Sequence, residues 1–98
     1  MAQSQFYMKY LNKILKYLAE KSSKDSGYSE RPEVMEHLLF DFGNEEENIL
    51  YNKLINKLKE DKYVAVKGES NDSVKITEKG TKFINETKGY TLRDKIYL

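Results

Sequence analysis

The spacing of apolar residues changes once along this chain, and that change constrains the fold more than any other feature. Up to about residue 62, apolar side chains recur every three or four residues, which is the period of an amphipathic α-helix. From Tyr63 onward the pattern becomes short runs of β-forming residues on either side of a turn-forming stretch, Gly68 to Ser73. We therefore predict a mainly α chain with a small antiparallel β-hairpin.

Three helices are predicted before the hairpin and one after it. The first spans residues 4–21, the second begins after Ser29 as the capping residue and ends at Gly43, and the third spans residues 45–62. The strands are expected at 63–67 and 74–77, and Thr77 should cap a final helix that runs to about Glu86. The expected buried positions of the first three helices are Tyr7, Leu11, Ile14, Leu15 and Leu18, then Val34, Met35, Leu38, Leu39 and Phe42, then Leu50, Tyr51, Leu54, Ile55 and Leu58.

Length and composition predict one domain at residues 1–88 and a short C-terminal tail at 89–98. No apolar run approaches the ~20 residues of a bilayer span, and the N-terminus lacks a secretory pattern, so a cytoplasmic location and no membrane contact are expected. The 98 residues include no cysteine and one histidine, His37. Because neither a nucleophile–base set nor a metal-ligand set is apparent, we expect no enzyme, no cofactor and no metal.

Charge is distributed unevenly along the chain, although the net charge is only +1. Residues 1–24 carry five Lys and one Glu, whereas residues 25–47 carry eight acids and one Arg. Residues 48–67 are basic again, with five Lys and two acids. The chain should therefore present basic helices around an acidic middle, and either charge could serve a partner.

Two stretches carry a resemblance to a known family. LINKLKEDKYVAV, from Leu54 to Val66, and VKITEKGTKFI, from Val74 to Ile84, resemble the helix-to-wing junction and second wing strand of small prokaryotic transcription regulators with winged helix-turn-helix domains. The resemblance implies a three-helix core, a wing formed by the hairpin and a C-terminal helix. One departure is Lys62, which stands where that junction usually has Gly.

In that family the third helix enters the major groove of double-stranded DNA, so the resemblance implies that its exposed side chains contact bases. Asn48, Asn52 and Asn56 are spaced by four and are expected to point outward, with Lys53 and Lys59 beside them. Asn can bond adenine bidentately, and Lys67 and Lys75 of the hairpin could reach phosphates. A solvated face is the alternative for the asparagines. The acidic run of residues 45–47 opposes an approach to phosphates at the start of this helix.

A second apolar stripe on the first helix predicts a homodimer interface, to which the tail contributes. The expected interface residues are Phe6, Tyr10, Tyr17, Tyr90 and Leu92. Alternatively, the tail folds over its own first helix. The predicted function is a DNA-binding transcriptional regulator. The alternative function is a protein–protein interaction module, such as a phage or mobile-element factor that docks on a host protein through the acidic segment 25–47 and an exposed Ile49.

Overall fold

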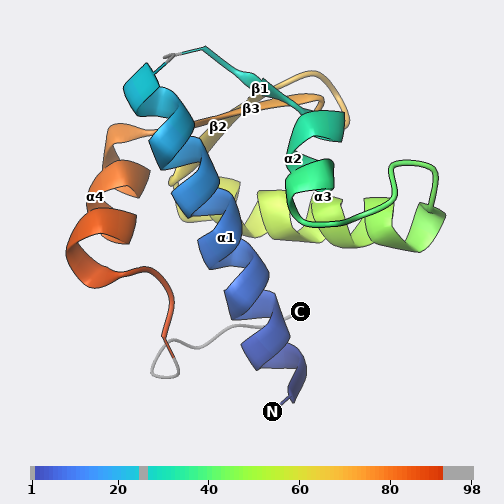
Figure 1. Ribbon diagram of the computed structural model, residues 1–98, viewed down its shortest axis with the longest axis horizontal. Coiled ribbons are helices and arrows are strands. Elements are labelled where there is room, and N and C mark those ends of the chain that lie inside the picture. Colours follow the sequence, from blue (N-terminus) through green and yellow to red (C-terminus); the bar gives the residue numbers. More distant parts are fainter. Residues whose placement is uncertain (1, 25–26, 92–98) are drawn as a thin grey trace.

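The structure is a computed structural model that describes residues 2–24 and 27–91, with side chains from Tyr7 onward. The elements follow the order α1 (Ala2–Lys24), β1 (Ser29–Glu30), α2 (Arg31–His37), α3 (Glu45–Glu60), β2 (Val64–Lys67), β3 (Ser73–Ile76) and α4 (Glu78–Thr87) (Figure 1). The predicted combination of a mainly helical chain and a small antiparallel hairpin is confirmed. The sheet has a third strand, β1, which the sequence analysis did not predict.

The sheet is antiparallel with strand order β1-β3-β2, so β3 is the central strand. Val64 pairs with Ile76, and Ser29 pairs with Val74, and these four side chains are buried. Because side chains alternate along a strand, the neighbouring positions point to the opposite face of the sheet. Helix α1 contacts β3 as well as α3 and α4, and in Figure 1 it runs between α4 on its left and α2 on its right.

The core is built from the apolar stripes of α1 and α3. Every buried position predicted for α1 is buried, and so are the four C-terminal ones of α3, whereas Leu50 is only half-buried. Burying one such side chain contributes roughly 1.5–3 kcal/mol, so these stripes supply most of the force that holds α1 against α3. Tyr7 adds a long-range polar contact, because its hydroxyl donates to the Lys53 carbonyl at 2.8 Å.

Helix α2 ends at His37, six residues before the predicted stop at Gly43. The N–H of Leu39 donates to Glu36 O at 2.9 Å and the N–H of Phe40 donates to Met35 O at 2.8 Å, which is the hydrogen-bond pattern of a Schellman C-terminus. Leu39 adopts the left-handed conformation that this ending requires, with φ of 64°. The predictions that Leu39 and Phe42 are buried are wrong, because the early end of α2 turns both side chains outward, where they are 85% and 54% exposed.

The helix starts agree only in part with the predicted caps. Thr77 accepts from the N–H of Gly80 at 3.0 Å, so its predicted role as the cap of α4 is confirmed. Asn44 caps α3 by accepting from Glu47 N at 3.1 Å. Ser29 is not the cap of α2, because it lies buried in β1, and Glu30 occupies that position without a side-chain cap bond.

Two conformational details position the hairpin at the end of α3. Lys62 has φ of 67°, the left-handed region that Gly favours, and its N–H donates to Lys59 O at 3.0 Å. The chain therefore makes the tight junction with Lys in place of Gly. Gly80 lets α4 approach that junction closely, since a Cβ built on it would lie 2.2 Å from the Tyr63 carbonyl oxygen.

Candidate functional site

The predicted asparagine row on α3 faces a buried arginine. Arg31, the first residue of α2, is 8% exposed, and its Nε and Nη2 donate to Asn48 Oδ1 at 3.2 and 3.0 Å. Its Nη1 donates to Asn52 Oδ1 at 2.7 Å and to the Ser70 carbonyl oxygen. The guanidinium carbon also lies 4.6 Å from the centroid of the Tyr51 ring. The predicted outward orientation of Asn48 and Asn52 is therefore wrong, because the side-chain oxygens of both residues accept hydrogen bonds from Arg31.

The same network extends to the β2–β3 turn. Asn71 is 7% exposed with φ of 57°, and its Nδ2 donates to Asn56 Oδ1 at 3.2 Å and to Asn52 Oδ1 at 3.4 Å. The Nδ2 of Asn48 donates a hydrogen bond to the Phe42 carbonyl oxygen at 2.7 Å. Helix α2, helix α3 and the β2–β3 turn are thus joined through one set of amides and one guanidinium. Of the three asparagines, only Asn56 remains exposed.

Sequence reasoning missed Arg31 and Asn71 as parts of this network. The signal that could have found Arg31 is that it is the only basic residue among eight acids in residues 25–47. A planar guanidinium presents several donors in a fixed fork, and a row of amide oxygens spaced by four on one helix face matches that fork. Within the described residues Arg31 forms no ion pair with a carboxylate, so neutral oxygens alone satisfy its donors.

The solvent-facing side of α3 changes charge along its length. Its exposed side chains are Glu45, Glu46, Ile49, Lys53, Asn56, Lys59 and Glu60. At a rise of 1.5 Å per residue, Glu46 lies about 10 Å from Lys53 and about 20 Å from Lys59 along the axis. Since the Debye length is about 8 Å at physiological salt, screening weakens the effect of the acidic first turn at Lys53 and largely removes it at Lys59.

The two hairpin lysines gather on the outer face of the sheet. Lys67 pairs with Ser73 and Lys75 pairs with Ala65 in the β2–β3 register, which places both lysines on the face opposite the core. Their Nζ atoms lie 4.3 and 5.9 Å from the centroid of the Tyr28 ring. Lys67 is exposed and Lys75 is half-buried, so Lys67 is the better placed of the two to meet an external phosphate.

The aromatic side chains predicted to form a dimer interface pack largely within their own chain. The Tyr10 ring meets Phe40 edge-on with centroids 5.1 Å apart, and Tyr17 stacks on His37 at 4.4 Å. Both tyrosines are half-buried by these contacts. The side chain of Phe6 and the whole of Leu92 lie outside the described residues.

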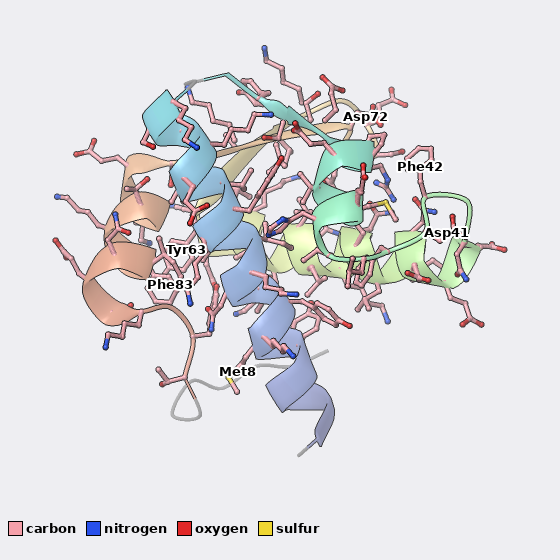
Figure 2. The ribbon with its side chains drawn as sticks, viewed as in Figure 1. Met8, Asp41, Phe42, Tyr63, Asp72 and Phe83 are labelled. Carbon is pink, nitrogen blue, oxygen red and sulfur yellow. The ribbon has the colours of Figure 1, made fainter. Side chains whose placement is uncertain are left out.

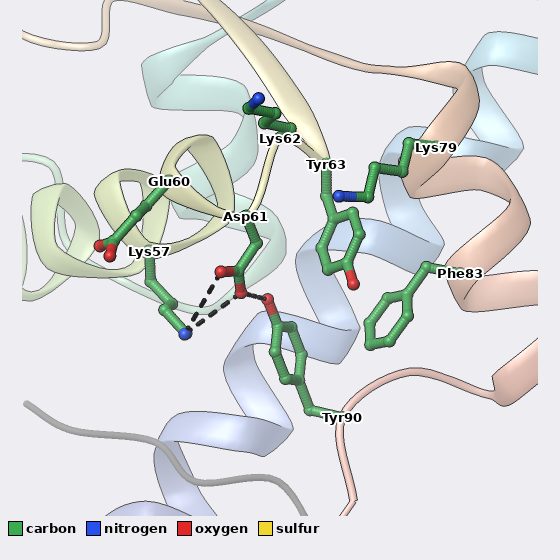
Figure 3. Close-up of a pocket in the computed structure, with 8 residues that line it drawn as sticks. All are labelled: Lys57, Glu60, Asp61, Lys62, Tyr63, Lys79, Phe83 and Tyr90. Carbon is green, nitrogen blue, oxygen red and sulfur yellow. Dashed lines mark hydrogen bonds and ion pairs between the residues drawn. The ribbon is translucent and has the colours of Figure 1, made fainter.

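Tyr90, the remaining predicted interface residue, is buried with 8% exposure (Figure 3). Its hydroxyl bonds Asp61 Oδ2, and its ring packs edge-on against Phe83 with centroids 4.9 Å apart. Asn12 of α1 clamps its backbone, donating to Tyr90 O at 2.9 Å and accepting from Tyr90 N at 2.7 Å. At Tyr90 the chain therefore folds over its own α1, which was the alternative to a dimer contact.

A hollow of about 400 Å³ lies beside this aromatic cluster (Figure 3). Tyr63 and Phe83 stack there with centroids 4.2 Å apart, and the Lys79 ammonium lies 5.4 Å from the Tyr63 centroid. Lys57 and Asp61 form an ion pair at 3.2 Å on the opposite wall. These contacts hold α3, α4 and the chain at Tyr90 together, so the cluster has a structural role.

A second hollow, of about 470 Å³, lies between α1 and the α2–α3 connection. Its lining consists of Lys9, Tyr10, Lys13, Leu38, Leu39, Phe40, Glu47 and Leu50. The large apolar side chains that the described residues leave most exposed are Leu39, Phe42 and Ile49. Leu39 and Phe42 lie on this connection, where Figure 2 labels Phe42, and Ile49 lies in the second turn of α3. We call the hollow and its lining residues the α1–α3 groove.

Tyr51 and Glu33 are among the ionisable groups whose pKa values are shifted by their surroundings. Desolvation by burial raises the pKa of Tyr51 to about 12, and its hydroxyl has no hydrogen-bond partner among the described residues. A hydrogen bond from Lys21 lowers the pKa of the Glu33 carboxyl. A tyrosine that holds its proton to such a high pH is suited to packing against Arg31 and not to proton transfer.

No group of three or more His, Asp or Glu residues in the described part of the chain could hold a metal ion. In residues 2–24 and 27–91, no helix is long and apolar enough to cross a membrane. Comparison with known proteins identifies no relative, since no family model, no curated protein and no solved structure matches this chain.

Proposed function

We propose that this chain is a winged-helix DNA-binding protein, a small transcriptional regulator that meets double-stranded DNA with the second half of α3 and with the β2–β3 hairpin as its wing. The supporting observation is the Arg31 network, which joins the hairpin turn to α3 through Ser70 and Asn71. Exposed side chains on the helix and on the hairpin therefore belong to one rigid unit. Preset geometry of this kind lowers the entropic cost of binding.

The residues assigned to DNA are those of the predicted set that remain exposed. Asn56 is assigned to a base edge through its Nδ2, because its Oδ1 accepts from Asn71, and Lys53, Lys59 and Lys67 are assigned to phosphates. Asn48 and Asn52 take a supporting role, because Arg31 holds their oxygens. The half-buried Lys75 adds charge from the sheet.

Acidic side chains among these lysines set the expected strength of binding. Glu60, Glu69 and Asp72 are exposed on the same two elements and their connecting turn. They oppose the approach of phosphates at contact distance, so we expect weak binding that depends strongly on salt.

The test is a fluorescence-anisotropy titration of a labelled mixed-sequence duplex at about 50 to 200 mM salt. Three phosphate contacts predict a slope of log K against log salt of about −2.7, at roughly 0.9 per contact. Replacing Lys53, Lys59 and Lys67 together by Gln should bring the slope close to zero. Lys82→Gln, an exposed lysine on α4, is the matched control and should leave the slope unchanged. No binding at the lowest salt, or an unchanged slope in the triple variant, refutes the proposal.

A second candidate function is a protein–protein interaction module on the same scaffold. It is favoured by the exposure of Phe42 and Ile49 next to the acidic first turn of α3, because neither exposed apolar side chains nor carboxylates favour contact with the DNA backbone. The discriminating experiment is a nuclease-treated pull-down from cells that express the chain, with Phe42→Asp as the control. A protein retained by the parent chain and lost with the variant supports this candidate, and recovery of no protein after nuclease treatment contradicts it.

A further inference from the structure

The α1–α3 groove has an apolar centre in which one side chain is held outward at a conformational cost. Leu39 is 85% exposed and has φ of 64°. The Schellman end of α2 needs a left-handed residue at this position, and Gly would meet that need without strain on a Cβ. Leu here instead places a large apolar side chain in solvent, beside the partly buried Tyr10, Phe40 and Leu50. An exposed apolar surface of this kind is stabilised by burial against another surface.

The two walls of the groove carry opposite charges. Lys9 and Lys13 follow each other by one turn on the α1 wall, and neither forms an ion pair within the described part of the chain. Glu47 lines the α3 wall, where its Oε2 accepts from the backbone N–H of Asp41 at 3.0 Å. Glu46, exposed in the same first turn of α3, adds a second carboxylate.

We propose that the α1–α3 groove is the interface of a two-fold homodimer, in which its basic wall faces the acidic wall of a second copy. A two-fold interface uses the same patch on both subunits, so the patch has to be complementary to itself. An apolar centre between a basic wall and an acidic wall meets that condition. Rotation about an axis through the centre brings Lys9 and Lys13 of each copy to Glu46 and Glu47 of the other.

The second copy fits this groove better than a partner of a single charge. An acidic partner would pair with α1 and be repelled at the first turn of α3, and a basic partner would meet the reverse. A second copy pairs both walls at once and packs the two Leu39 side chains near the axis. This dimer differs from the one predicted through Tyr17 and Tyr90, and of that set it retains Tyr10. It does not depend on the proposed DNA binding.

The experiment measures the mass of the full chain by sedimentation equilibrium over about 1 to 500 µM protein. The expected result is a concentration-dependent species of twice the 11.5 kDa of one chain. Two charge-reversed variants, Lys9→Glu with Lys13→Glu and Glu46→Lys with Glu47→Lys, should each dimerise at least about tenfold more weakly, because like charges then face each other. Lys16→Glu is the matched control, since Lys16 is exposed on α1 and does not line the groove.

Mixing the two variants provides the decisive measurement. In the mixed pair both contacts are again between opposite charges, so the heterodimer should form with an affinity near that of the parent chain. Circular dichroism confirms that each variant is folded, and Glu46→Lys alone replaces the second variant if loss of the Glu47 contact to Asp41 prevents folding. A parent chain that stays monomeric at the highest concentration overturns the proposal. Variants that dimerise like the parent, or folded variants that do not recover on mixing, also overturn it.

Discussion

Replacing Arg31 by Met should cost about 3 kcal/mol of unfolding free energy. Methionine keeps much of the apolar stem, so the change isolates the loss of the guanidinium donors. Asn48 would lose three contacts, and Asn52 and Ser70 would each lose one. A hydrogen bond to a charged group contributes about 1.5–3 kcal/mol, but relief of the buried charge and rehydration of Ser70 offset part of the sum.

Urea unfolding followed by circular dichroism measures this loss. With a slope of about 1.5 kcal/mol per M for a chain of this size, the midpoint should fall by about 2 M. Arg31→Lys should give an intermediate loss, because one ammonium cannot reach all the oxygens that the planar fork reaches. Glu36→Met, an exposed change on the same helix, serves as the control and should stay within about 0.5 kcal/mol. If Arg31→Met lowers stability by less than about 1 kcal/mol, the network does not hold α2, α3 and the hairpin together.

Three further predictions concern single positions. The pKa of Tyr51 is about 12 in the folded chain and near 10 in the unfolded chain, so the free energy of unfolding should fall by about 2–3 kcal/mol as pH rises through that window. Tyr51→Phe should remove that part of the loss in urea titrations at alkaline pH. In dilute samples of the monomer, Leu39→Gly should raise the free energy of unfolding by about 0.5 kcal/mol and with it the thermal midpoint; a lower midpoint there would contradict the strain at φ 64°. The same change should weaken dimerisation in sedimentation runs. Gly80→Ala should destabilise by about 1–3 kcal/mol because its Cβ would meet the Tyr63 carbonyl, whereas Gly43→Ala, whose nearest atom is 3.4 Å away, should change calorimetric stability little.

Periodicity was sufficient to predict the long helices and the hairpin. Helices α1 and α3 each carry an apolar stripe over four or more turns, so errors at single residues do not alter the assignment. The end of α2 could not be predicted in the same way. Leu38 and Leu39 continue the apolar spacing and Gly43 resembles a stop, but the backbone reverses at Leu39 through a conformation that leucine seldom adopts.

The candidate site shows a different limit of sequence reasoning. The spacing of Asn48, Asn52 and Asn56 correctly places them along one side of α3, but it does not reveal what covers that side. The covering groups come from Arg31, 17 residues before Asn48, and from Asn71, 15 residues after Asn56. Contacts between residues so far apart in sequence depend on how α2 and the hairpin pack. The spacing of polar residues on a helix is the same whether that face contacts water or a guanidinium, so the sequence does not distinguish the two.

The two proposals bear on each other through the charge at the start of α3. As a monomer the chain presents Glu45, Glu46 and Glu47 at the end of the helix that would otherwise attract phosphates. In the proposed dimer, Lys9 and Lys13 of the second copy lie against two of these carboxylates and reduce the local negative charge. Two copies also double the number of lysines that one duplex can meet, and the second contact becomes intramolecular. DNA affinity should therefore rise with dimerisation, although the residues assigned to DNA and the residues of the α1–α3 groove are separate sets.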